Sequence, residues 1–390
     1  MVGPAPAYSA HTGAGNHIVD RGNLLRTLNL VQNSNFNLLS INRNEISQIG
    51  GTDSITTRKI TSQPEVSFSF SHVLSDGRNE DMLGFCISGE NSAFLSGIHE
   101  KNKDRNFFLA VSDDQSEDFN LQKDYSNIDI LSFGNCFPVS YSINAAVGSL
   151  STANLEYLAS NVKAEKPNTA YGITDEAIAK IDYAVSGIIP AINPENGQAA
   201  TSADTHGYLV SSGNISEKGT INSGDIHYLR PGDIELTLPP LSSPGALISG
   251  DNKMHINQLS INIPIGRTSS VGFGSNYTTE RKLSLPILAN VNFSAVANNF
   301  TQENLNNVFT KDEEYTFTIT LRDPTSSAGG IPTNKAIELE VTQAKCQSES
   351  ISEAIGGNMQ VNAAFTFECT PFTGFKFSGI ASTEEAATWV

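Results

Sequence analysis

Short stretches in which apolar and polar residues alternate recur along the chain. In PEVSFSFS (64–71) valine and phenylalanine alternate with glutamate and serine. In NVNFSA (290–295) valine, phenylalanine and alanine alternate with asparagine and serine, and GDIELTL (232–238) has the same period. An apolar residue at every second position gives a strand one buried face and one exposed face. These stretches therefore predict half-buried β-strands.

Two of these strands belong to a longer internal resemblance. RKITSQPEVSFSFS (58–71) is echoed by RKLSLPILANVNFSA (281–295), and residues 127–158 are echoed by residues 336–367. The front segments are offset by 223 to 225 residues and the back segments by 208 to 210, so the second copy is shorter by about fifteen residues. Because the echoes keep their order, the sequence predicts an internal duplication of one β-domain.

The duplication divides the chain into five parts. Residues 1–30 are rich in glycine, alanine and proline and are expected to form a flexible arm. The first copy is expected to span residues 31–165. The second copy is expected to span 250–380, followed by a short tail at 381–390. The connector between the copies, 166–249, is expected to contain one helix and one strand.

Three segments are predicted to form short helices. In the connector, Thr174 is expected to cap DEAIAKIDYAV, whose isoleucines and valine fall on one stripe. In the second copy, Thr301 is expected to cap QENLNNVF. In the first copy, ENSAFLSGI (90–98) is a weaker candidate. Each copy would thus carry one helix beside its strands.

Composition favours a mainly β fold. Charged residues make up 17% of the chain, beside 31 glycines and 20 phenylalanines, whereas long helices would be richer in charged helix formers. The formal net charge of -17 argues against a protein that binds nucleic acid by neutralising phosphates, but not against one that lets DNA pass. The chain begins without a basic and apolar leader, and its longest apolar run (183–192) is too short to span a bilayer.

The sequence contains no constellation typical of catalysis or metal binding. The seven histidines are scattered, and neither a phosphate-binding loop nor a nucleophile elbow occurs. The acids of SDGRNED (75–81) lack the ligand pattern of a calcium loop, so we interpret this segment as a polar hairpin turn. The four cysteines show no CxxC spacing and are expected to be reduced thiols. A non-enzymatic protein without a cofactor is therefore predicted.

Five segments carry a resemblance to a known family. They include IPAINPENG and YLRPGDIELTL and are residues 31–85, 136–165, 189–197, 228–238 and 256–295. In their order along the chain and in their residue patterns they resemble the major tail protein of bacteriophages, the subunit of the tail tube. The resemblance implies tandem tube domains, each a β-sandwich or open barrel with one flanking helix. It also implies rings of six such domains around a DNA channel.

The resemblance implies roles for two sets of residues. Polar strand faces are expected to line the channel, where like charges would keep DNA centred and mobile. The candidate channel residues are Glu65, Ser67, Ser69, Asp129, Glu156, Glu235, Asn290, Asn292, Glu338 and Glu340. The arm and the polar loop 42–60 are expected to contact the neighbouring ring. The candidate residues of this loop are Asn42, Asn44, Glu45, Ser47, Asp53 and Thr56.

Two domains in one chain imply three chains per ring, with pseudo-six-fold symmetry. Free sheet edges are expected to pair from domain to domain around such a ring. The expected partners are further copies of the chain and the terminator, baseplate or tip, and tape-measure proteins. The expected location is a virion tail assembled in the bacterial cytoplasm, with no membrane partner and no specific DNA binding. A related tail-end, baseplate-hub or head-decoration protein and a secreted β-sandwich adhesin stay open as alternatives.

Overall fold

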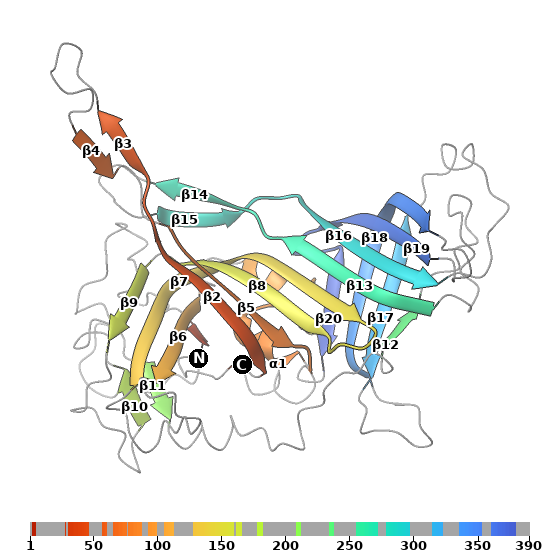
Figure 1. Ribbon diagram of the computed structural model, residues 1–390, viewed down its shortest axis with the longest axis horizontal. Coiled ribbons are helices and arrows are strands. Elements are labelled where there is room, and N and C mark those ends of the chain that lie inside the picture. Colours follow the sequence, from red (N-terminus) through yellow and green to blue (C-terminus); the bar gives the residue numbers. More distant parts are fainter. Residues whose placement is uncertain are drawn as a thin grey trace.

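The described residues of the computed structural model lie mainly in β-strands (Figure 1), which confirms the mainly β fold. Among the described residues the helices are α1 (Arg78–Leu83) and α2 (Ser96–His99). The structure describes residues 2–4, 28, 30–46, 57–60, 65–75, 77–87, 93–99, 105–112, 128–159, 161–165, 178–181, 208–211, 234–237, 255–271, 278–296, 314–322, 335–352 and 360–379.

The strands range from three residues in β1 to 19 residues in β7. β7 and β18 are long because each takes part in two sheets. The bounds in chain order are β1 Val2–Pro4, β2 Val31–Ser40, β3 Arg43–Ile46, β4 Thr57–Ile60, β5 Glu65–Val73, β6 Arg105–Ser112, β7 Ile128–Ala146, β8 Thr152–Ala159, β9 Asn161–Glu165, β10 Ile178–Ile181, β11 Tyr208–Ser211, β12 Ile234–Thr237, β13 His255–Pro264, β14 Arg267–Val271, β15 Thr278–Leu283, β16 Ile287–Val296, β17 Tyr315–Arg322, β18 Lys335–Ser352, β19 Gln360–Cys369 and β20 Phe375–Gly379.

Eight antiparallel strands form one continuous sheet, the long sheet, in the order β2-β5-β8-β7-β13-β16-β19-β18. The first half of the chain ends at β7 in this order, and the second half begins at β13. Two further groups of strands, the first and second small sheets, have the orders β1-β6-β7-β9 and β12-β17-β18-β20. β7 and β18 run from the long sheet into the small sheets and so hold the layers together.

Each small sheet packs on the apolar face of the long sheet to form a sandwich. In the first half, the ring of Phe68 in β5 lies 4.8 Å from that of Phe107 in β6 and 4.6 Å from that of Phe133 in β7. In the second half, the ring of Phe365 in β19 lies 4.7 Å from that of Phe317 in β17. Aromatic pairs at these separations stabilise a core beyond the area they bury. The alternation of the sequence puts these rings on the inner face of each sheet.

The pairing pattern of the first half recurs in the second half. β2-β5-β8-β7 corresponds to β13-β16-β19-β18, and the small sheets correspond strand for strand. The β-bulges recur too, at residue 32 in β2 and 257 in β13, and at residue 139 in β7 and 347 in β18. Matching the bulges gives offsets of 225 (257 minus 32) and 208 (347 minus 139). Both offsets fall within the ranges of the sequence echoes.

The segment that contains α1 and α2 joins the two halves. The backbone N–H of Phe94 donates to the carbonyl of Phe375 in β20, at 2.9 Å. The N–H of Gly379, also in β20, donates to the carbonyl of Ile87, at 3.1 Å. These bonds cover an edge strand of the second small sheet with chain from the first half. The two halves are therefore fixed together by more than the long sheet.

Helix α1 corrects the interpretation of SDGRNED as a hairpin turn. Gly77 and Gly84 flank the helix with positive φ angles of 86° and 92°, a conformation that favours glycine. Glu80 and Asp81 lie in the first turn, where the helix dipole favours negative charge. Leu83 and Glu80 are buried against the body of the protein. Capping and burial together select a helix here.

The other expected elements fare differently. Strand β12 confirms the alternating stretch of the connector. The helix expected after Thr174 is wrong for its described part, which forms β10 and pairs with β11, because a paired strand outweighs weak helix propensity. α2 overlaps the candidate helix 90–98, and the helix expected after Thr301 lies outside the described residues. The arm is not wholly irregular, since β1 pairs with β6.

Phe68→Ala is expected to lower the free energy of unfolding by about 3–5 kcal/mol, because it leaves a cavity among packed rings. Phe372→Ala is the matched control, since Phe372 is 74% exposed, and it is expected to stay within about 0.5 kcal/mol of the parent. Chemical denaturation followed by near-ultraviolet circular dichroism measures both. Equal losses in the two variants would contradict the described core.

Candidate assembly interface

The outer face of the long sheet carries small polar side chains in rows that cross the strands. Asn154 Nδ2 donates to Ser142 Oγ at 3.5 Å, and Asn292 Nδ2 donates to Ser260 Oγ at 3.5 Å. The polar positions arise from the same alternation that buries the aromatic core. One complete row, strand by strand, consists of Asn33, Ser71, Asn154, Ser142, Asn262, Asn290, Thr366 and Lys345.

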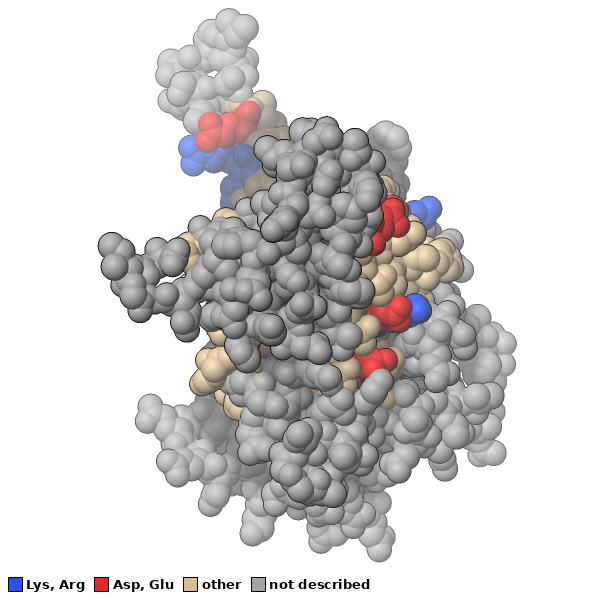
Figure 2. Space-filling view, turned by 90° about the vertical axis from the view of Figure 1, so that its right-hand side faces the viewer, with Lys and Arg blue, Asp and Glu red and all other residues tan. Residues whose placement is uncertain are grey.

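Charge is sparse on this outer face. The Asp, Glu, Lys and Arg residues that the described pairings place there are Glu65, Glu156, Glu368 and Lys345. The surface therefore consists mainly of asparagine and serine rather than of acids. Figure 2 views the molecule from the end that carries β17 to β19, where the described surface is mostly uncharged, with scattered acidic and basic groups.

The ten candidate channel residues lie on different surfaces. Glu338 and Glu340 belong to the second small sheet, where the alternate residues of β18 are buried. They therefore lie on the opposite surface of the sandwich, and Glu340 pairs there with Lys376 at 3.3 Å. Asp129 and Glu235 also belong to the small-sheet parts of the fold, in β7 and β12. The residues that share the outer face of the long sheet are Glu65, Ser67, Ser69, Glu156, Asn290 and Asn292.

Strands β3 and β4 pair only with each other in the described structure and form a hairpin that projects from the body (Figure 1). Arg58 Nε lies 2.9 Å from Glu45 Oε1 across the hairpin, but both side chains are more than half exposed, so this pair contributes little stability. The candidate inter-ring residues described here, all exposed, are Asn42, Asn44 and Glu45. Those outside the described residues are Ser47, Asp53 and Thr56.

The two halves meet where β7 pairs directly with β13. The β14–β15 hairpin strengthens this junction, since Arg267 and Arg281 lie 5.2 Å and 5.1 Å from the ring centroid of Phe137 in β7. Arg267 Nε also donates to the carbonyl of Pro138, and Arg281 Nη1 donates to that of Leu158, each at 3.4 Å. Cation–π contacts and these bonds hold the second half against the first.

The long sheet ends at β2 on one side and at the C-terminal part of β18 on the other (Figure 1). Among the described strands, β2 pairs with β5 alone, and residues 348–352 of β18 pair with β19 alone. β2 also exposes large apolar side chains, with Val31 42%, Phe36 41% and Leu38 39% exposed. An edge strand with exposed apolar residues is a site where another strand can add.

Sequence reasoning missed the apolar residues of β2. The stretch VQNSNFNLLS does not alternate regularly, because bulges at residue 32 and near its end break the period of two. Alignment of β2 with β13 through their bulges would have placed Phe36 at a core position of β13. The internal repeat could therefore have identified Phe36 as a core-type position, whereas the local alternation of apolar and polar residues in β2 could not.

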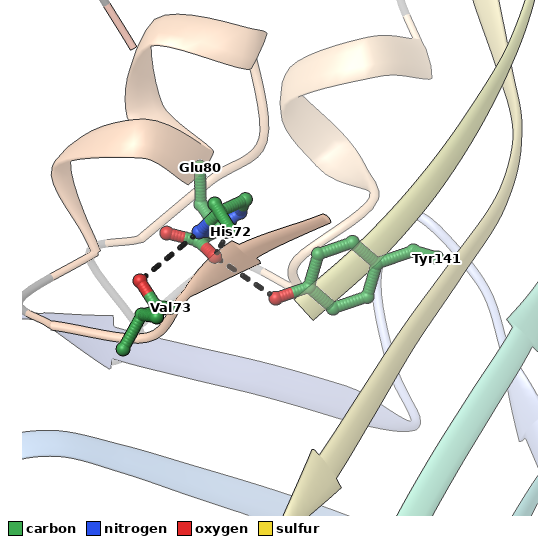
Figure 3. Close-up of polar contacts among 4 residues, drawn as sticks. All are labelled: His72, Val73, Glu80 and Tyr141. Atoms are coloured by element: carbon green, nitrogen blue, oxygen red, sulfur yellow. Dashed lines mark hydrogen bonds and ion pairs between the residues drawn. The ribbon is translucent and has the colours of Figure 1, made fainter. Parts of the chain in front are cut away.

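A buried polar cluster ties α1 to the long sheet (Figure 3). The hydroxyl of Tyr141 donates to Glu80 Oε1 at 3.1 Å, and His72 Nε2 lies 3.4 Å from the same oxygen. All three residues are at most 1% exposed. Burial, with the nearby charge of Glu80, raises the pKa of the Tyr141 hydroxyl well above its usual value, so it remains a donor. The cluster is closed to solvent and holds α1 against β5 and β7.

The described residues contain no group of three or more His, Cys, Asp and Glu side chains that could hold a metal ion. Among the described helices, none has the length and apolar character needed to cross a membrane.

Comparison with known proteins gives only distant likenesses. No family model and no curated protein matches the chain. Among solved structures, a sheath-tube complex of an extracellular contractile injection system matches with a TM-score of 0.28 and 11% identity, over 44% of this chain and 99% of that chain. The tube-terminating cap of the anti-feeding prophage matches with a TM-score of 0.26 and 11% identity, over 41% of this chain and 99% of that chain. At TM-scores this low, the likenesses establish neither the fold nor the function of this chain.

Tyr141→Phe is expected to lower the free energy of unfolding by about 1–3 kcal/mol at neutral pH, because Glu80 loses a buried donor. An unfolded tyrosine ionises near pH 10, whereas the raised pKa keeps native Tyr141 protonated. Above that pH the unfolded state binds fewer protons, so the parent loses stability as pH rises. The variant should lose less over the same range. Urea titrations from neutral to alkaline pH measure this, and parallel curves would contradict it.

Proposed function

We propose that this chain is a structural subunit of a bacteriophage tail tube, in which rings of three chains stack around a channel for DNA. Each chain would supply two tube domains, at residues 31–165 and 250–380. The observation that carries the proposal is the long sheet itself. Its two halves have the same pairing pattern and join edge to edge through β7 and β13. The long sheet ends at β2, which is equivalent to β13, and at the C-terminal part of β18, which is equivalent to β7.

The junction between the halves offers a template for the junction between chains. A head-to-tail contact closes into a ring when its repeated rotation completes one full turn without a rise. Closure of the sheet would remove both edges, which are otherwise open to unwanted pairing. With two domains in one chain, half of the ring contacts are intramolecular, so less translational and rotational entropy is lost on assembly. This gives a physical reason for the repeat.

The outer face of the long sheet suits a channel wall that does not bind DNA. Strong binding of DNA needs lysine and arginine beside phosphates. The face instead presents rows of asparagine and serine, with Glu65 and Glu156 as its acidic candidates. We therefore assign this face to the channel and the small sheets to the outside. Glu338 and Glu340 then belong to the outer surface of the tube.

The proposed role is structural and not enzymatic, and it needs no cofactor. The partners would be further copies of the chain, with terminator, baseplate or tip, and tape-measure proteins in the virion tail. The β3–β4 hairpin projects from the body (Figure 1), and we assign it to the contact with a neighbouring ring. Asn42, Asn44 and Glu45 would make this inter-ring contact. Assembly would take place in the bacterial cytoplasm.

Negative-stain electron microscopy of the purified chain tests the proposal. Hollow cylinders are expected, with a mass per ring three times the 41.8 kDa of one chain. Rings of six chains would contradict the trimer. Single rings that never stack would instead indicate a tail-end or hub protein. Chains that stay monomeric at high concentration would contradict the proposed assembly.

Cysteine labelling distinguishes the channel face from the outside. The Ser69→Cys variant places a thiol on the outer face of the long sheet, and the Ser378→Cys variant places one in β20 opposite Glu338. Both variants also carry Cys346→Ser, because Cys346 is exposed and would react with the label. In cylinders, a bulky polymer-linked maleimide is expected to modify the Ser69→Cys variant much more slowly than the Ser378→Cys variant. A small maleimide should modify both, as should the bulky reagent in dissociated chains. Equal rates in cylinders would contradict the assignment of the channel face.

A further inference from the structure

We infer that β2 of one chain pairs antiparallel with β18 of the next chain, in the register that the internal junction dictates. The inference rests on the proposed ring and names the contact that closes it. The occupant of each free edge is thus a second copy of this chain. β2 and residues 348–352 of β18 lie at opposite ends of one sheet, as successive subunits of a head-to-tail ring require.

The recurring bulges provide the register. The offset of 225 makes β2 equivalent to β13, and the offset of 208 makes β18 equivalent to β7. The pairing with the next strand supports the offset of 225. Asn35 in β2 pairs with Ser69 in β5, and Ser260 in β13 pairs with Asn292 in β16. The two offsets therefore come from a whole set of pairings and not from a single match.

The internal pairs translate directly into pairs between chains. Ser142 in β7 pairs with Asn262 in β13. Adding 208 to the first number and subtracting 225 from the second gives Ser350 and Asn37. Small polar side chains again face each other, so the rows of the outer face would continue across the boundary between chains. The channel wall would then be uniform around the ring.

An exposed apolar residue of β2 agrees with this register. Phe36 is equivalent to Ile261. Ile261 is 0% exposed, whereas Phe36 is 41% exposed. β13 has a strand on both sides and β2 has one strand, β5, at its side. A strand added to β2 would remove this apolar surface from water, which favours the contact.

The junction between chains would lack the arginine–aromatic contacts of the internal junction. Arg267 and Arg281 contact the ring of Phe137 in the internal junction. The position equivalent to Phe137 in β18 is Lys345, which offers no aromatic face. The contact between chains therefore depends on backbone pairing and on the burial of Phe36.

Disulfide cross-linking tests the register. A chain with Asn37→Cys and Ser350→Cys, in the Cys346→Ser background, is oxidised after assembly. Residues directly opposite in antiparallel strands have Cα atoms about 4.5–5.5 Å apart, which suits a disulfide. Covalent dimers and trimers that revert on reduction are expected on a denaturing gel. The ladder should end at the trimer, because a closed ring has no further free edge.

Two control pairs make the result specific. Ser142→Cys with Asn262→Cys is the internal equivalent and should form a disulfide within one chain, without dimers or trimers. Asn35→Cys with Ser350→Cys is shifted by two residues and should cross-link poorly, because diagonal neighbours are about 7–8 Å apart. Efficient cross-linking of the shifted pair alone would overturn the register.

A second variant tests the edge without cysteines. Phe36→Asp should abolish assembly and leave the circular dichroism of the monomer native-like, with a lower midpoint of thermal unfolding, because the Phe36 ring is 41% exposed but also lies 6.3 Å from the buried ring of Phe133. Phe372→Asp, at a phenylalanine that is 74% exposed outside the junction, should assemble normally. Cylinders that form with Phe36→Asp, together with cylinders of the Asn37→Cys, Ser350→Cys chain that do not cross-link, would overturn the inference and leave the tube in place. Parent chains that neither assemble nor cross-link would overturn both.

Discussion

Backbone pairing across the long sheet is the constraint on which the rest of the structure depends. Every strand in its interior pairs with a neighbouring strand on both sides, and each of the two end strands pairs on one side within this sheet. The protein covers an edge of the second small sheet with the segment that carries α1 and α2. The edges of the long sheet are left to other contacts. The fold thus separates edges closed within the chain from edges available for assembly.

The alternation of the strands serves two purposes at once. Its apolar half builds the aromatic cores, in which Phe68 and Phe365 join the long sheet to the small sheets. Its polar half produces a face of asparagine and serine that neither attracts nor strongly repels phosphate. Because this face holds few charges, it contributes little to stability through ion pairs. Stability has to come from the buried rings and from the cluster around Glu80.

The period of two was enough to predict the strands at 64–71, 232–238 and 290–295 and the mainly β fold. It was not enough for α1, because the buried Glu80 is explained by Tyr141, 61 residues away in the sequence. It also could not separate the candidate channel residues. Alternation tells which residues share a face of one strand, but a sandwich has two outward faces. Glu65 and Glu338 therefore look alike in sequence and lie on opposite surfaces.

In the proposed ring, the two kinds of junction have different tasks. The rotation between neighbouring domains must be accurate, since errors at successive junctions add and would prevent closure. The internal junction fixes this rotation through the arginines at Phe137 and through the bonds from β20 to Ile87. With half of the steps fixed in this way, the junctions between chains need only strand pairing and modest apolar burial. A weaker contact there allows wrongly joined chains to separate before the ring closes, while closure itself makes the finished ring stable because a chain can leave only when both of its junctions break.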